Sequence, residues 1–154
     1  MQALATPSDG PTGGGASADE PENPGIAPAN PEDIPHLETM QELAQQAANE
    51  IDANCTGSCK LPWVRGTLIH KRFADKVRAL GGSYNAEISY KDRLRVDYGT
   101  KGSIRADAIY GDIARPKFVV ELKTGRFNYM SRGEARQYLE NLPRGTDVYP
   151  LKVD

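Results

Sequence analysis

The side chains that could do chemistry together are concentrated between residues 102 and 125. Asp107 lies in one run of strand-forming residues, and Glu121 follows fourteen residues later in the next run, with Lys123 two residues further on. Because side chains alternate between the two faces of a strand, Glu121 and Lys123 point to the same face. If the two runs pair, the three side chains converge at one end of a sheet. Two carboxylates and the backbone carbonyl of Leu122 would then form an all-oxygen site suited to Mg²⁺ or Mn²⁺.

Lys123 has a chemical use beside such a metal ion. Its ammonium group can position an attacking water, and its charge can stabilise the negative charge that builds up when a phosphodiester is attacked. The alternative is a surface ion pair on an edge strand, because Asp and Glu are common where strands end. For a single carboxylate that alternative is the better one. The spacing of Asp107, Glu121 and Lys123, within strand-forming residues that end at Thr124-Gly125, favours the metal site.

The spacing of apolar residues predicts three helices around these side chains. An amphipathic helix is expected over residues 37–51, where apolar residues recur at steps of three and four. A second helix is expected over residues 63–80, ended by a pair of glycines. A third is expected over residues 131–141, where Ser131 and Glu134 have the spacing of a capping box.

Strands are expected between and after these helices. The strand-like runs are residues 84–90, 104–110, 117–123 and 148–153. Alternating Leu94, Val96 and Tyr98 suggest one further short strand. Pro150 argues that the last strand lies at an edge. The order of helix, three or four strands, helix and strand predicts the α/β class, with an open mixed sheet flanked by helices.

Composition divides the chain into three parts. Residues 1–35 contain 7 Pro and 5 Gly and very few large aliphatic side chains, which predicts a disordered acidic linker that cannot offset its ordering entropy. Residues 36–60 carry the first helix and a cysteine-containing loop. Residues 61–154 form the domain with the candidate site. The absence of a long apolar run argues against a membrane span, and the start of the chain has no signal-peptide pattern.

Charge is split unevenly between the two ends of the chain. Residues 1–59 hold 10 Asp and Glu and no Lys or Arg, whereas residues 60–154 hold all 19 Lys and Arg against 11 Asp and Glu. An acidic arm on a basic domain suggests a polyanionic partner such as nucleic acid. The alternative is a basic surface that is merely solvated, because net charge reports association tendency and not function.

Cys55 and Cys59 are the only cysteines of the chain. Three states are open to them on sequence alone: a local disulfide, two free thiols, or part of a metal site. The metal site is the least favoured of the three, because neither His36 nor His70 has the spacing of a zinc finger.

The same stretch of sequence carries a family resemblance. Asp107 followed by Glu121-Leu122-Lys123 resembles the signature of the PD-(D/E)XK nucleases, and residues 98–107 with Glu-Leu-Lys-Thr-Gly look like the nuclease toxin domains at the C-termini of Rhs-type and other polymorphic bacterial toxins. The resemblance covers roughly residues 62–153. Ala106 stands where the family's namesake proline would precede the aspartate, a position that supplies no metal ligand.

The resemblance implies a restriction-endonuclease-like αβα core and a set of residue roles. Asp107 and Glu121 would bind Mg²⁺ or Mn²⁺ together with the Leu122 carbonyl, and Lys123 would act on the attacking water. Relatives often place a side chain from the first helix of the domain over the site, which makes His70 a candidate. Related nucleases also have a glutamine in the helix after the core strands, where it orients the strand-end lysine or the nucleic acid. This makes Gln137 a second candidate. The alternatives for these two are a structural histidine and an ordinary exposed glutamine.

Four further residues are candidates from their position alone. Glu87 shares a strand face with polar neighbours and is either a further carboxylate of the metal site or solvent-facing. Arg105 and Ser103 are placed to grip a substrate phosphate or to brace Asp107. Arg126 follows the site closely and is a candidate for a phosphate contact, which would make binding depend on salt.

These observations predict a metal-dependent nuclease, with DNA favoured over RNA, acting as an antibacterial toxin domain. Such a domain would be delivered by a bacterial secretion system into a target cell and would need a neutralising immunity protein, expected to be acidic and to cover the basic site. One alternative keeps the fold but cleaves tRNA or other RNA. Another is a non-catalytic module that binds nucleic acid or protein.

Overall fold

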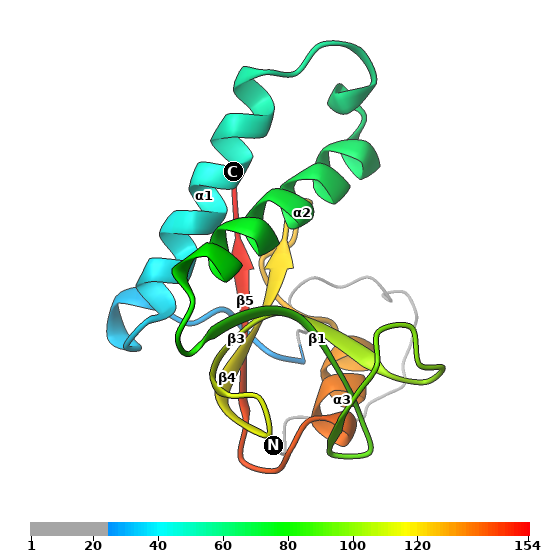
Figure 1. Ribbon diagram of the computed structural model, residues 1–154. Helices are drawn as coiled ribbons and strands as arrows, with labels where there is room; N and C mark the ends of the chain where they lie inside the picture. The colour runs from blue at the N-terminus through cyan, green and yellow to red at the C-terminus, as the bar shows by residue number, and fades with distance from the viewer. Residues whose placement is uncertain (1–24) are drawn as a thin grey trace.

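The computed structural model describes residues 25–154 (Figure 1). The part of the predicted linker before residue 25 lies outside the described residues. The main elements are α1 (Leu37–Ala53), α2 (Pro62–Leu80), β1 (Tyr84–Lys91), β2 (Leu94–Val96), β3 (Ile104–Asp112), β4 (Arg115–Lys123), α3 (Arg132–Asn141) and β5 (Asp147–Lys152). Two short 3-10 turns, Pro31–Asp33 and Gly57–Lys60, precede α1 and α2.

One mixed sheet organises the domain, with the strand order β2-β1-β3-β4-β5. Neighbouring strands are antiparallel except for β4 and β5, which are parallel and joined through α3. The α/β class and the mixed sheet flanked by helices are therefore confirmed, as is the short strand β2. Pro150 lies in β5, at an edge of the sheet, where a missing backbone donor is tolerated.

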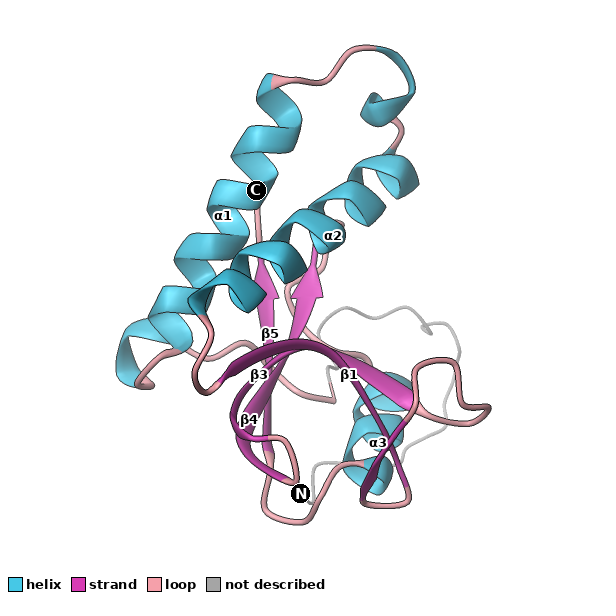
Figure 2. Cartoon of the chain, in the orientation of Figure 1, coloured by secondary structure: helices cyan, strands magenta, loops and turns pink. Residues whose placement is uncertain are grey.

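Helices cover both faces of this sheet (Figure 2). On one face, α1 and α2 form a hairpin whose buried side chains, such as Met40 and Phe73, pack with Val120 of β4. On the other face, Leu142 and Tyr138 pack with Ile109 of β3. None of the helices within residues 25–154 combines the length and apolar character needed to cross a lipid bilayer.

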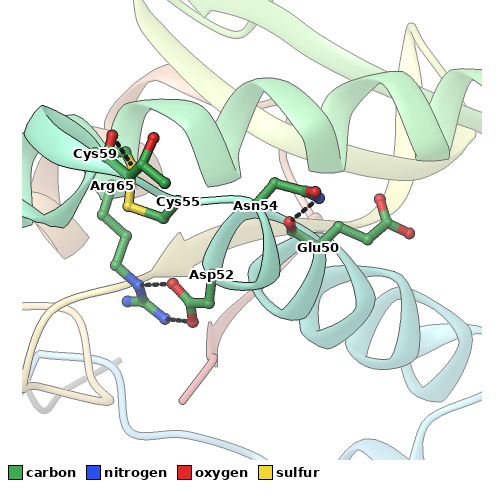
Figure 3. Close-up of a disulfide and its surroundings, with 7 residues drawn as sticks. Glu50, Asp52, Asn54, Cys55, Cys59 and Arg65 are labelled. Carbon is green, nitrogen blue, oxygen red and sulfur yellow. Dashed lines mark hydrogen bonds and ion pairs between the residues drawn. A yellow bond between two sulfur atoms is a disulfide. The ribbon is translucent and has the colours of Figure 1, made fainter.

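The connection between α1 and α2 is tied in two ways (Figure 3). Cys55 and Cys59 form a disulfide, the first of the three states that the sequence left open. Arg65 of α2 donates two hydrogen bonds to the Asp52 carboxylate, at 2.8 and 2.9 Å, and a third to the backbone oxygen of Asp154. The beginning of α2 is thus fixed to the end of α1 and to the end of the chain.

The first described residues, Gly25 and Ile26, lie on the face of the sheet that α3 covers. Gly25 and Ile26 donate backbone hydrogen bonds to the carbonyl of Met130, and Ile26 and Met130 form an isolated β-bridge. A Cβ at Gly25 would lie 2.7 Å from the Arg132 backbone, so only glycine fits this approach to α3. Within the described part of the chain, the predicted linker therefore ends in a segment that packs on the domain.

Gly66→Ala tests how closely α2 approaches the end of β4. A Cβ at Gly66 would lie 2.8 Å from Thr124 Oγ1, so the free energy of unfolding should fall by about 1–3 kcal/mol despite the better helix propensity of alanine. Gly133→Ala on α3 is the matched control, because a Cβ there meets nothing within 4 Å. Urea unfolding measures both variants, and unchanged stability of Gly66→Ala would contradict the close approach.

Candidate active site

The site lies where β3 and β4 stop pairing. Ala108 and Val120 are the last partners at this end of the two strands, and Asp107 and Glu121 are the next residues of each strand. The backbone N–H of Leu122 donates instead to Asp107 Oδ2 at 2.6 Å. The strand end thus carries both carboxylates next to each other, as the spacing in the sequence predicts.

An open cleft of about 910 Å³ gives access to these carboxylates. The cleft runs along α2, and its other walls are formed by residues of β1, the β2–β3 loop, β3, the end of β4 and α3. Its lining residues are Trp63, Gly66, Thr67, His70, Lys71, Asp75, Arg78, Glu87, Tyr98, Ile104, Arg105, Asp107, Glu121, Thr124, Glu134 and Tyr138.

His70 of α2 reaches the carboxylate end of the sheet. Its Nδ1 lies 2.8 Å from the carbonyl oxygen of Gly66, and its Nε2 lies 3.2 Å from that of Leu122 and 3.5 Å from Asp107 Oδ2. All three partners are acceptors, so both ring nitrogens must carry hydrogen and the ring is an imidazolium. Burial lowers the pKa of His70, but the Asp107 carboxylate, the Gly66 carbonyl and the Glu121 carboxylate together raise it by more, to about 9.

Glu121 is the carboxyl group with the most perturbed environment in the cleft. Burial and the neighbouring Asp107 charge raise its pKa to about 7, against the opposing effects of Tyr138 and Lys123. The Tyr138 hydroxyl donates to Glu121 Oε1 and also lies 3.1 Å from the carbonyl oxygen of Arg105. Burial and the Glu121 carboxylate raise the pKa of Tyr138, so this hydroxyl remains a donor.

Lys123 is held between two carboxylates. Its Nζ lies 3.7 Å from Glu121 Oε2, and it donates to both carboxylate oxygens of Glu134, at 2.8 and 3.0 Å. Glu134 also accepts the backbone N–H of Ser131 in the capping box of α3. The carboxylate of Glu134 therefore both caps the first turn of α3 and orients the strand-end lysine.

Sequence reasoning missed the roles of Glu134 and Tyr138. Glu134 is recognisable in the sequence only as a capping residue, and Tyr138 has no motif of its own. Their spacing of four residues does place them on one side of a helix. The spacing thus predicts that Glu134 and Tyr138 share one face of a helix. It does not predict that this face contacts Lys123 and Glu121.

Glu87 and Arg105 line the cleft but do not contact the carboxylate pair. Glu87 has a positive φ of 57°, and its carboxylate forms an ion pair with Arg78 at 2.5 Å. The Arg105 guanidinium lies over the Tyr98 ring, 5.0 Å from its centroid. Neither side chain therefore braces Asp107, whereas Arg105 remains positioned to face a substrate in the cleft.

Lys123 and Leu122 are not among the residues that line the cleft, and the three remaining candidates, Ser103, Gln137 and Arg126, also lie outside the lining. Ser103 donates its hydroxyl to the Thr100 carbonyl at 2.6 Å and so braces the β2–β3 loop. Gln137 is exposed on α3, and Glu134 makes the contact to Lys123 that was expected of it. Arg126 lies over the Phe127 ring in the exposed loop after β4.

The donor groups at the strand end fit a hard divalent cation. Asp107, Glu121 and the Leu122 carbonyl offer oxygen only, and burial and the Asp107 charge raise the pKa of Glu121, an effect that a bound cation would oppose. Within residues 25–154 no three His, Cys, Asp or Glu side chains are placed to hold a metal together. Such an ion would therefore need water or substrate oxygens as well, and the His70 ring would have to move aside.

No protein-family model matches this chain, and neither does any curated protein or solved structure. The chemistry of the domain must therefore be inferred from the geometry of its cleft.

The raised pKa of Glu121 makes the stability of the metal-free protein depend on pH. A carboxyl group whose pKa is about 7 in the folded protein and 4.5 as its ordinary value stabilises the fold at low pH, and this contribution is lost as pH rises through 7. The free energy of unfolding should fall between about pH 5 and pH 7, by on the order of 1–3 kcal/mol. Urea unfolding in EDTA measures this slope.

Glu121→Gln should flatten the slope in this interval. Glu140→Gln, which changes an exposed carboxylate on α3 outside the cleft, should leave it unchanged. Equal slopes for the parent and Glu121→Gln would show that Glu121 titrates normally.

Proposed function

We propose that this domain is a metal-dependent nuclease that hydrolyses phosphodiester bonds in the cleft beside α2. The observation that carries the proposal is the meeting of Asp107, Glu121 and Lys123 where β3 and β4 separate. The Lys123 and Glu121 side chains are only 16% and 17% exposed, which gives their charges strength toward a group in the cleft. An acidic pair with a fixed ammonium group beside it is the equipment that phosphodiester hydrolysis by a divalent cation requires.

We also propose that the sheet is a restriction-endonuclease-like core. The order helix, three strands, helix and strand from α2 to β5 supports this, with β2 as an addition between β1 and β3. Helices lie on both faces of the sheet, as an αβα core requires.

Each residue of the site has a distinct task in the proposed reaction. Asp107 and Glu121 would hold Mg²⁺ or Mn²⁺, which when bound supplies Lewis-acid polarisation of the scissile phosphate. Lys123 would offer its N–H groups to the attacking water and to the phosphoryl oxygen that gains charge. Glu134 would fix the direction of that ammonium group. The oxygen of water would bond to phosphorus and give up one proton to solvent, the ester bond to the leaving oxygen would break, and the leaving oxygen would take up a proton from solvent.

A non-catalytic binding module is the second candidate, and the position of His70 favours it. The imidazolium already lies against Asp107 and the Leu122 carbonyl, two of the three groups that would hold the metal. In such a module His70 and Lys123 neutralise the carboxylates permanently. Binding of nucleic acid without any metal-dependent cleavage would support the module.

The proposal extends to the role of the domain as an antibacterial toxin with DNA as its favoured substrate. RNA is the alternative substrate. Delivery into a target cell and protection of the producer by an acidic immunity protein belong to this proposal, and the basic composition of residues 60–154 is compatible with such a partner.

Removing either charge at the strand end should abolish cleavage. Glu121→Gln and Lys123→Met should each lower the cleavage rate by about 100-fold or more, because the transition-state charge loses its stabilisation. The assay uses supercoiled plasmid, single-stranded circular DNA and total RNA, each separately and each with Mg²⁺ and with EDTA. Glu140→Gln should cleave like the parent. Equal rates for the parent and Lys123→Met would refute the assignment, and activity that survives EDTA would refute the metal.

Glu134 should act on the reaction through Lys123. Glu134→Gln keeps an oxygen for the Ser131 N–H and should change stability little, but it loses the charged partner of Lys123. Cleavage should fall about tenfold and its pH profile should shift. Glu134→Ala also loses half of the capping box and should cost about 1 kcal/mol of unfolding free energy. If Glu134→Gln retains the parent's rate and pH profile, Glu134 is a capping residue only.

A further inference from the structure

Two aromatic side chains on the rim of the cleft are exposed to solvent. Trp63 is 70% exposed and Tyr98 is 75% exposed, and both belong to the residues that line the cleft. A single exposed aromatic residue needs no explanation. Two that come from different elements and line the same cleft as the carboxylate pair point to a ligand there.

Trp63 is carried by a fixed backbone. It is the second residue of α2, after Pro62 at the first helical position, and its carbonyl accepts the Thr67 hydroxyl at 2.9 Å. Two residues on, Arg65 binds the Asp52 carboxylate and the end of the chain. The helix start is therefore held in place while the indole ring extends into solvent.

Tyr98 is carried by a loop that is closed by its own hydrogen bonds. Thr100 donates both its backbone N–H and its hydroxyl to the Asp97 carbonyl, at 3.1 and 2.7 Å. Ser103 donates both of its groups to the Thr100 carbonyl. The Arg105 guanidinium lies over the ring and supports one side of it. A loop ordered in this way loses little entropy when a ligand stacks on the ring.

Two cations in the lining of the cleft are available to the phosphate groups of a bound strand, although carboxylates outnumber cations in the lining as a whole. Asp75 and Glu87, the lining carboxylates nearest the end of α2, are both paired with Arg78. Within residues 25–154, neither Lys71 nor Arg105 forms an ion pair with a carboxylate. Exposed aromatic faces and unpaired cations in one cleft are the elements of sites that bind single-stranded nucleic acid.

We propose that Trp63 and Tyr98 stack on unpaired nucleobases of a strand whose backbone crosses the cleft, so that the substrate is single-stranded nucleic acid. In a duplex the faces of the bases are covered by their neighbours and cannot reach the two rings. That the bound strand is also cleaved rests on the proposed function. The stacking itself concerns binding only and can be tested without cleavage. Single-stranded DNA and single-stranded RNA share the chemistry that the rings would recognise.

Trp63 is the only tryptophan of the chain, so its fluorescence reports the contact directly. The full chain in EDTA, where the proposed cleavage cannot occur, is titrated with four ligands of equal length: single-stranded DNA, single-stranded RNA, duplex DNA, and a single strand made of abasic sugar-phosphate units. Quenching by a base-bearing single strand, and not by the duplex or the abasic strand, is the expected result. A comparison of the affinities for single-stranded DNA and single-stranded RNA then shows which of the two is the preferred ligand.

Substitution of the rings should weaken binding without unfolding the domain. Trp63→Ala and Tyr98→Ala should each weaken the affinity for a labelled single strand by about 5-fold to about 150-fold, the range for loss of one stacked base. Trp63→Phe and Tyr98→Phe keep a ring and should retain most of the affinity. Leu80→Ala on the same helix and Leu94→Ala on β2 are exposed controls outside the cleft and should bind like the parent.

The possible failures point to different causes. Equal binding of duplex and single strand, equal binding of the abasic strand, no binding at all, or unchanged affinity of both alanine variants would each overturn the stacking inference. Metal-dependent cleavage together with any of these results would leave the proposed nuclease intact. Selective quenching by single strands without any metal-dependent cleavage would support the stacking and refute the nuclease.

Discussion

The structure depends on the need to balance two carboxylates at one strand end. Asp107 and Glu121 follow the last paired residues of β3 and β4, and burial together with their mutual repulsion raises the pKa of Glu121 to about 7. A carboxylate pair in this setting must be stabilised by neighbouring cations and donors. The chain provides an imidazolium on one side and an ammonium on the other. Each comes from a different layer of the fold.

The helices can be understood as supports for these two cations. His70 can face Asp107 because α2 passes close to Thr124, which the missing Cβ of Gly66 permits. Lys123 can face Glu121 because the capping box of α3 holds Glu134 beside it. The disulfide and Arg65 fix the start of α2, and the capping box fixes the start of α3. The site therefore tolerates little movement of either helix relative to the sheet.

Local sequence patterns were sufficient for the elements and for the acidic core of the site. Period-two alternation placed Glu121 and Lys123 on one face, and pairing of β3 with β4 brought Asp107 next to them. The partners of these groups were harder to foresee, because they depend on how helices lie on the sheet. Gln137 and Tyr138 are neighbours in sequence, but only Tyr138 lies on the side of α3 that bears Glu134 and faces the sheet.

The same limit applies to the residues around the strand end. Glu87 has the right type and faces Asp107 across β1 and β3, yet its backbone leaves the regular strand conformation and its carboxylate pairs with Arg78. Arg105 was expected either to grip a substrate phosphate or to brace Asp107, and its guanidinium lies over the Tyr98 ring and not on Asp107. A sequence pattern gives the face of a strand, but a competing partner on a neighbouring loop or helix decides where a long side chain ends.

The charge of the cleft bears on how a polyanion would bind there. Its lining contains five carboxylates, including Asp107, Glu121 and Glu134, against three Lys and Arg side chains and His70. The excess of Lys and Arg in residues 60–154 therefore lies mostly elsewhere on the domain. Attraction between charges alone would do little to bring a phosphate to the strand end, since the carboxylates of the lining outnumber its cations. A bound divalent cation would reverse this local sign, and stacking on Trp63 and Tyr98 adds affinity that does not depend on charge. The proposed metal and the proposed aromatic contacts would therefore reinforce each other at this cleft, because the cation makes the strand end attractive to phosphate while the rings hold the adjoining bases.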